Sequence, residues 1–357
     1  MPVDRPRARD IGIAIGDMPP GQHNAITDVP GVVVGHVTLI EGEGPLHVGR
    51  GPIRTGVTAN LPHGGNVFER KVTGAVEVIN GFGKSLGLPQ IAELGEIETP
   101  LLLTNTLSVW QAADALVTYM AGRNPGVYSF NPVVGECNDS FLNDILGRHI
   151  TQAHVLQALE TARGGPIPEG NVGAGTGMSG FGWKAGIGTA SRRISRGESR
   201  LTLGALVVTN TGVAEDLRIA GAHIGAVIRP PRTAPSPPGS IMIILATDAP
   251  VSARQLKRVA RRAGFGLART GALAAHGSGD FVIAFSTAQS APLEAASMPD
   301  RDLTPLFKAT IEATEEAIVN SLLAAETMVG RDGNVRYAIP AERVAELVRA
   351  CAPQPPP

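Results

Sequence analysis

The peptide bond Gly239–Ser240 stands where residue types and position suggest covalent chemistry. It follows residues 229–238, of which five are proline, and it precedes the apolar run 241–245. Because proline interrupts helices and central strands, an exposed loop is predicted here, leading into a buried strand. A chain cut after Gly239 would begin with Ser240, whose hydroxyl could attack a carbonyl while its own α-amine accepts the proton. The alternative is an ordinary surface loop, which the local composition by itself favours.

Two polar patterns are candidates for the walls of a site. At the start of a predicted strand, Ser278 and Asp280 are two residues apart and therefore project to the same side. The same alternation aligns Glu136 with Asn138 in the segment 133–139. Polar groups on one face beside apolar runs can line a cavity. A solvent-facing strand edge has the same pattern, and the spacing leaves both interpretations open.

Two glycine motifs compete with this site. Residues 83–87 match the G-x-S-x-G pattern that would make Ser85 a nucleophile, but Pro89 follows where the helix of such a motif would begin. Residues 175–180 match G-x-G-x-x-G without the flanking strand and helix of a dinucleotide site, so these glycines are expected to allow close backbone approach. The histidines and cysteines form no metal-ligand spacing, and no metal or other cofactor is expected.

The overall composition limits the partners of the protein. Its 357 residues include 31 Lys and Arg against 32 Asp and Glu, without a long basic stripe, so no nucleic-acid partner is expected. No apolar stretch is long enough to span a membrane, and no membrane partner is expected. Cys137 and Cys351 lie far apart in the sequence, which is typical of a reducing compartment, and the predicted location is cytoplasmic.

Strands and helices that could position these residues alternate along the chain. Strands are predicted for apolar runs at 31–40, 74–79, 100–104, 202–209, 241–246 and 280–285. Helical periodicity covers 108–121, 152–162, 252–270 and 304–330, and a short helix follows Pro340. Because both kinds of element occur on each side of residue 240, the two halves are predicted to interleave in one α/β core.

Several segments, in order and over nearly the whole chain, carry a family resemblance. They are residues 24–32, 54–59, 61–66, 79–84, 103–106, 186–192, 238–241 and 246–250. Together they resemble the L-aminopeptidase/D-esterase and β-peptidyl aminopeptidase family of autoprocessing N-terminal-nucleophile hydrolases. The resemblance implies an αββα sandwich, two stacked sheets flanked by helices, as a single domain over 1–357. It also implies cleavage into an α chain (1–239) and a β chain (240–357), and a homo-oligomer of αβ units.

The resemblance further implies roles for the catalytic residues. Ser240 would attack the substrate carbonyl, with its freed amine as base. Asn210 would donate its side-chain amide to the oxyanion, which can stabilise a transition state by about 2.7–4 kcal/mol. Ser278 and Asp280 would orient and polarise the amine and hydroxyl of Ser240.

The substrate side of the site follows from the same resemblance. Glu136 would pair with the free ammonium of the substrate. Asn138 stands where well-known members carry a tyrosine, which would supply a second oxyanion donor, so the sequence departs from the family there. The expected function is that of an autoprocessed serine aminopeptidase or amidase acting on small peptides, amides or esters through an acyl-Ser240 intermediate. The alternatives are a self-cleaving acyltransferase of similar fold and a non-catalytic small-molecule binding protein whose chain stays intact.

Overall fold

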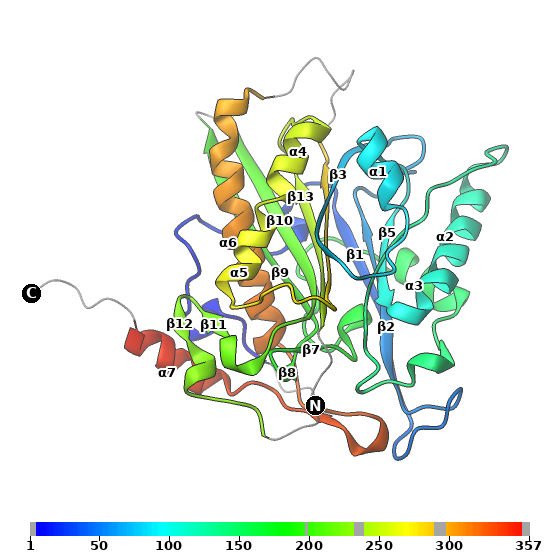
Figure 1. Cartoon of the computed structure of the whole chain (residues 1–357). Coiled ribbons are helices and arrows are strands. Elements are labelled where there is room, and N and C mark those ends of the chain that lie inside the picture. The colour runs from blue at the N-terminus through cyan, green and yellow to red at the C-terminus, as the bar shows by residue number, and fades with distance from the viewer. Residues whose placement is uncertain (1–4, 197–198, 232–238, 289–297, 352–357) are drawn as a thin grey trace, which may run out of the picture.

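Two β-sheets face one another at the centre of the molecule. The computed structural model describes residues 5–196, 199–231, 239–288 and 298–351 (Figure 1). The first sheet has the order β1-β2-β5-β6, formed by Val33–Glu41, Ile53–Leu61, Leu101–Asn105 and Val133–Cys137. The second has the order β4-β3-β14-β13-β10-β9, formed by Glu96–Ile97, Val72–Gly81, Gly279–Ser286, Ser240–Thr247, Ser199–Asn210 and Ile187–Arg196.

Helices cover the outer face of each sheet (Figure 1). Beside the second sheet lie α4, α5 and α6, which are Ala253–Ala260, Ala263–Arg269 and Thr304–Leu323. Beside the first lie α2 and α3, which are Val109–Arg123 and Gln152–Glu160. The remaining α-helices are α1 (Leu88–Leu94) and α7 (Ala341–Cys351). The described structure also contains three short hairpins: β7–β8 (Ser179–Gly180, Trp183–Lys184), β11–β12 (Arg218–Ile219, Ala222–His223) and β15–β16 (Met328–Val329, Val335–Arg336).

Strand β13 shows why the sheets stack. Because successive side chains of a strand point to opposite faces, Ile241 and Ile243 pack in the cluster that includes the α4, α5 and α6 side chains. Met242 and Ile244 instead pack between the two sheets, beside residues of the first sheet such as Leu103. A continuous apolar run buried on both faces is the pattern of a central strand. The predicted αββα sandwich is therefore confirmed.

Three predicted elements have different bounds in the structure. The helix predicted over 252–270 is two helices, α4 and α5. The long helix ends at Leu323 rather than at Gly330. There the side chain of Asn171 bonds both the N–H and the C=O of Glu326, so these backbone groups have a tertiary partner in place of a helical one. Of the predicted loop at 229–238, residues 232–238 lie outside the described residues.

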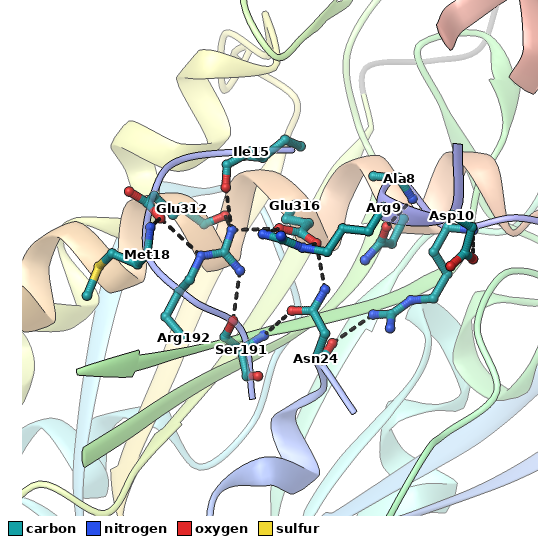
Figure 2. Close-up of polar contacts among 12 residues, drawn as sticks. Ala8, Arg9, Asp10, Ile15, Met18, Asn24, Ser191, Arg192, Glu312 and Glu316 are labelled. Atoms are coloured by element: carbon teal, nitrogen blue, oxygen red, sulfur yellow. Dashed lines mark hydrogen bonds and ion pairs between the residues drawn. The ribbon is translucent and has the colours of Figure 1, made fainter. Parts of the chain in front are cut away.

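Strands β2, β6 and β9 were not predicted as strands, and β9 shows the reason. Its Arg192 is completely buried, where a sequence pattern would place an apolar residue. Figure 2 shows its guanidinium between Glu312 and Glu316 of α6, with Nε 3.0 Å from a Glu312 oxygen and Nη2 2.6 Å from a Glu316 oxygen. A buried ion pair of this kind depends on partners that are remote in sequence. Within the described part of the chain, no helix combines the length and apolarity needed to cross a bilayer.

Candidate active site

The register of the second sheet gathers the predicted catalytic residues at one end. Ser240 is the first residue of β13, and it lies opposite Asn210, the last residue of the antiparallel strand β10. On the other side of β13, the parallel strand β14 places Asp280 beside Ile241. Strands from both sides of the Gly239–Ser240 bond are therefore adjacent in the sheet. Ser240 is buried at their shared end, with 7% of its surface exposed.

The hydroxyl of Ser240 and the carboxylate of Asp280 are held by neighbouring groups. The N–H of Gly279 donates a hydrogen bond to Ser240 Oγ at 3.1 Å. Ser278 Oγ donates to Asp280 Oδ1 at 2.7 Å, so these two side chains do share one side. Burial raises the pKa of Asp280 to about 6, although the hydrogen bond from Ser278 opposes this shift. Asp280 Oδ2 is buried and has no hydrogen-bond partner among the described residues.

The side-chain amide of Asn210 is fixed at both ends. Its Oδ1 accepts a hydrogen bond from the Ser179 N–H at 2.9 Å, and its Nδ2 donates to the carbonyl of Asn138 at 3.0 Å. An amide NH₂ has two hydrogens, so one remains available to a group in the adjoining cavity. A donor whose orientation is set in advance can stabilise a developing negative charge without reorganising during the reaction.

Support for this amide comes from Arg336, which sequence reasoning did not single out. Arg336 ends the β15–β16 hairpin, is 1% exposed, and donates from Nε to Ser179 Oγ at 3.1 Å. Its guanidinium lies 3.6 Å from the centre of the Phe141 ring. Burial lowers the pKa of Arg336 to about 10. Because this pKa is still well above 7, the guanidinium is positively charged at neutral pH. No local motif marks this residue, because its partners come from distant segments.

A cavity of about 280 Å³ opens in front of Ser240. Asn210, Asn138 and Gly239 line it together with Ser240, and Glu136 forms part of its wall. Glu136 Oε1 accepts the backbone N–H of Lys84 at 2.8 Å, and its Oε2 accepts the hydroxyl of Thr106. Lys84 and Thr106 were not predicted as site residues, because a backbone donor has no signature in the side-chain sequence.

Asn138 has a different setting from Glu136. Strand β6 ends at Cys137, and the side chain of Asn138 is exposed just beyond it. Its Oδ1 accepts the backbone N–H of Ser140 at 2.9 Å. The contact with Asn210 is made by the main-chain carbonyl of Asn138, so any residue at this position could make it.

Close backbone packing accounts for glycine at two places near the site. A Cβ at Gly239 would lie 1.5 Å from the carbonyl oxygen of Asn210, so the residue before Ser240 has no room for a side chain. In the segment 175–180, a Cβ at Gly175 would lie 2.3 Å from the backbone nitrogen of Ile187. These glycines therefore allow neighbouring backbone segments to approach, as the sequence predicts for 175–180.

The structure differs from the sequence-based expectation at the segment that follows the G-x-S-x-G motif. Helix α1 does begin after the motif, with Pro89 in its first turn, where proline is well tolerated. Pro89 therefore does not exclude a helix after the motif, contrary to the expectation from the sequence. In the described structure, however, the only hydrogen-bonding contact of Ser85 Oγ is to Met242 Sδ at 3.6 Å. A nucleophilic serine needs a base within hydrogen-bonding reach, and among the described residues no base forms a hydrogen bond with Ser85 Oγ.

Several known proteins are similar to this chain in sequence and structure. The model of peptidase family S58 matches residues 24–336. The β-peptidyl aminopeptidase BapA of Sphingosinicella xenopeptidilytica is 42% identical, over 98% of this chain and 92% of that protein. Among solved structures, the PH0078 protein from Pyrococcus horikoshii OT3 is 51% identical, with a TM-score of 0.91 over 97% of this chain and 99% of that one.

A further solved structure is the L-aminopeptidase D-Ala-esterase/amidase from Ochrobactrum anthropi, described as a prototype for the serine aminopeptidases and a variant of the Ntn hydrolase fold. It is 39% identical, with a TM-score of 0.88 over 97% of this chain and 99% of that one. These matches confirm the family resemblance seen in the sequence. The chain therefore belongs to peptidase family S58 and is a hydrolase of the aminopeptidase type.

Proposed function

We propose that this protein is an autoprocessed serine aminopeptidase or amidase that releases N-terminal amino acids from small peptides, amides or esters through an acyl-Ser240 intermediate. We further propose that the protein is a single domain, which self-cleavage divides into two chains, 1–239 and 240–357. The observation that carries it is the position of Ser240. Its hydroxyl is fixed by the Gly279 N–H, the amide of Asn210 lies across the strand pair, and the residue before it is a glycine packed against Asn210.

Self-cleavage would use the same groups as later turnover. Ser240 Oγ attacks the carbonyl carbon of Gly239, the peptide C–N bond breaks, and the nitrogen becomes the α-amine of Ser240. The resulting ester between Gly239 and Ser240 Oγ is then hydrolysed by water, which yields the Gly239 carboxylate and a free hydroxyl. The spare N–H of Asn210 is the donor for the oxyanion of this step.

Turnover then begins with the new α-amine as base. Its unperturbed pKa of about 7.7–8.0 suits proton transfer near neutral pH. The hydroxyl of Ser240 transfers its proton to the amine and attacks the substrate carbonyl. The amine passes the proton to the leaving group, and water hydrolyses the acyl-Ser240 ester. Asp280 Oδ2, buried without a hydrogen-bond partner in the described structure, would accept a hydrogen bond from this amine.

An assay of purified protein tests this function. An amino-acid amide and its N-acetylated analogue are each incubated with and without an amino-acid acceptor. A free amino acid released from the unblocked amide supports a hydrolase, whereas an acyl-acceptor conjugate as the sole product supports the acyltransferase alternative. An intact chain that binds the amide without converting it would support the binding-protein alternative.

Gly239→Ala is expected to slow self-cleavage. The methyl group would lie 1.5 Å from the carbonyl oxygen of Asn210, so the scissile peptide must move away from Ser240 Oγ. A displacement of about 1 Å can reduce a rate on the order of 100-fold. The measurement is the fraction of cut chain against time on a denaturing gel. Gly64→Ala is the control, because a Cβ there would meet nothing within 4 Å. Equal cutting rates would contradict the prediction.

Glu136→Gln is expected to lower kcat/KM for substrates with a free α-ammonium by about 10- to 100-fold. Hydrogen bonds to charged groups contribute about 1.5–3 kcal/mol, and the neutral amide loses that charge assistance. Glu98→Gln is the control, because Glu98 lies 3.4 Å from Lys71 and does not line the cavity. The kinetic constants of the cut enzymes are compared on one amide substrate. Unchanged discrimination against the N-acetylated analogue would count against the role of Glu136.

Arg336→Met is expected to reduce kcat about tenfold with little change in KM, because Ser179 and, through it, Asn210 lose their support. Arg5→Met is the control, since Arg5 also anchors backbone carbonyls, those of Leu323 and Ile339, but does not contact the site. Both variants are assayed after cleavage and at equal folded fraction. A loss of stability without a change in kcat would show that Arg336 does not position the amide.

The remaining proposals concern location and assembly. We place the protein in the cytoplasm, since Cys137 and Cys351 are both free thiols in the structure. Small peptides or amino-acid amides are the proposed substrates, and a homo-oligomer of αβ units is the proposed assembly.

A further inference from the structure

A second cavity, of about 160 Å³, adjoins the site on the side of Gly239. It shares Thr211, Gly212 and Gly239 with the cavity in front of Ser240. Ser278, which bonds Asp280, also lines it. Glu136 lines only the first cavity. The two spaces are therefore neighbours that meet at the residue preceding the nucleophile.

The walls of the second cavity are largely apolar. Val213, Leu273, Ala274 and Ala275 line it, and Asp216 is its one charged wall residue among those described. Val213 is 54% exposed and Leu273 is 76% exposed, so both can be covered by a bound molecule. An apolar space of this size has room for one aliphatic or aromatic side chain.

The loop that carries this wall is anchored. Asn80 of β3 donates from Nδ2 to the carbonyls of Ala275 and His276, at 3.1 and 3.2 Å, and to that of Ser278. The backbone of Ala274 is in the left-handed region, with φ of 48°, which is uncommon for a residue with a side chain. The wall is thus a specified conformation next to the catalytic residues.

The direction of the reaction decides which part of a substrate reaches this cavity. The nitrogen of Ser240 that becomes its α-amine is bonded to Gly239 in the uncut chain. During turnover this amine must come within hydrogen-bond distance of the leaving nitrogen to give it a proton. Glu136 would hold the ammonium of the residue that contains the scissile carbonyl, so the acyl group occupies the first cavity, which both Glu136 and Ser240 line. The adjoining second cavity, which Glu136 does not line, is then the space left for the leaving group.

We propose that the second cavity is a subsite for an apolar side chain on the leaving group, so that the enzyme prefers peptides whose second residue is aliphatic or aromatic. The inference rests on the proposed function, because it takes Ser240 as the nucleophile and its amine as the proton donor. Because the carboxylate of Asp216 lines the cavity, we expect it to disfavour a leaving group whose side chain is negatively charged.

The test compares three substrates that share one N-terminal residue. They are the simple amide, the dipeptide amide with leucine second, and the dipeptide amide with glycine second as its matched partner. The cut wild-type enzyme is expected to have a kcat/KM about 10- to 200-fold higher for leucine than for glycine in the matched pair, the range available to an apolar pocket. Leu273→Asp should reduce this ratio at least about fivefold.

Two further variants make the result decisive. Val213→Asp places a charge at another lining residue of the same cavity and should act in the same direction. Leu94→Asp is the matched control, an exposed leucine at the end of α1 that does not line the cavity, and it should leave the ratio unchanged. A wild-type ratio near one, or a ratio unaffected by both wall variants, would overturn the subsite. Absence of turnover on every substrate by a correctly cut enzyme would instead overturn the proposed function.

Discussion

Ser240→Ala is expected to remain a single uncut chain with no measurable amidase activity. The substitution removes the hydroxyl that we propose attacks Gly239, and without cutting, residue 240 has no free α-amine to act as base. Loss of a nucleophile and its base together lowers kcat by a factor on the order of 10⁶. The fold should persist, since Ser240 Oγ makes only the hydrogen bond from Gly279 in the described structure. Intact mass and amide hydrolysis are the two measurements.

Ser85→Ala is the matched control for this experiment. Ser85 belongs to the competing G-x-S-x-G motif, and among the described residues its hydroxyl forms a hydrogen bond only with the sulfur of Met242. The variant should therefore cut itself and hydrolyse amides like the wild type. Full activity of Ser240→Ala would exclude Ser240 as the nucleophile. Complete inactivity of Ser85→Ala would instead assign that role to Ser85.

Asn210→Ala is expected to have the second-largest effect, a fall in kcat on the order of 10²–10³ with a much smaller change in KM. The amide is held by the Ser179 N–H and the Asn138 carbonyl, so its free N–H acts without reorganisation. Removing one such donor costs about 2.7–4 kcal/mol in the transition state. Self-cleavage should slow as well, because it forms an oxyanion at the same place.

The measurement uses cut enzyme only, with the cut fraction counted by mass and kcat expressed per active site. Asn171→Ala is the matched control, since that side chain also bonds at both ends, to the N–H and C=O of Glu326, but lies outside the catalytic cavity. If Asn210→Ala cuts and turns over as fast as Asn171→Ala, another group must hold the oxyanion.

How much of the molecule could be predicted depends on where the partners of each residue lie. Strands β13 and β14 were predicted because a strand buried on both faces is a continuous apolar run. The pairing of Ser278 with Asp280 followed from alternation within one strand. Both patterns are local, so a single sequence contains them.

Features that depend on distant partners could not be read in this way. Strand β9 carries the buried Arg192, whose acidic partners are on α6, 120 and 124 positions away in the sequence. Arg336 and Ser179 are 157 positions apart. The bond from the Lys84 N–H to Glu136 uses a backbone group that every residue but proline has. In each case the signal exists only after the chain has folded.

If cutting at one peptide bond creates the nucleophile, the intact mass of freshly purified protein under denaturing conditions will reveal it. Two species are expected, one ending at Gly239 and one beginning at Ser240, in equal molar amounts. A single full-length mass, accompanied by amide hydrolysis, would instead show that activity does not require the free amine of Ser240.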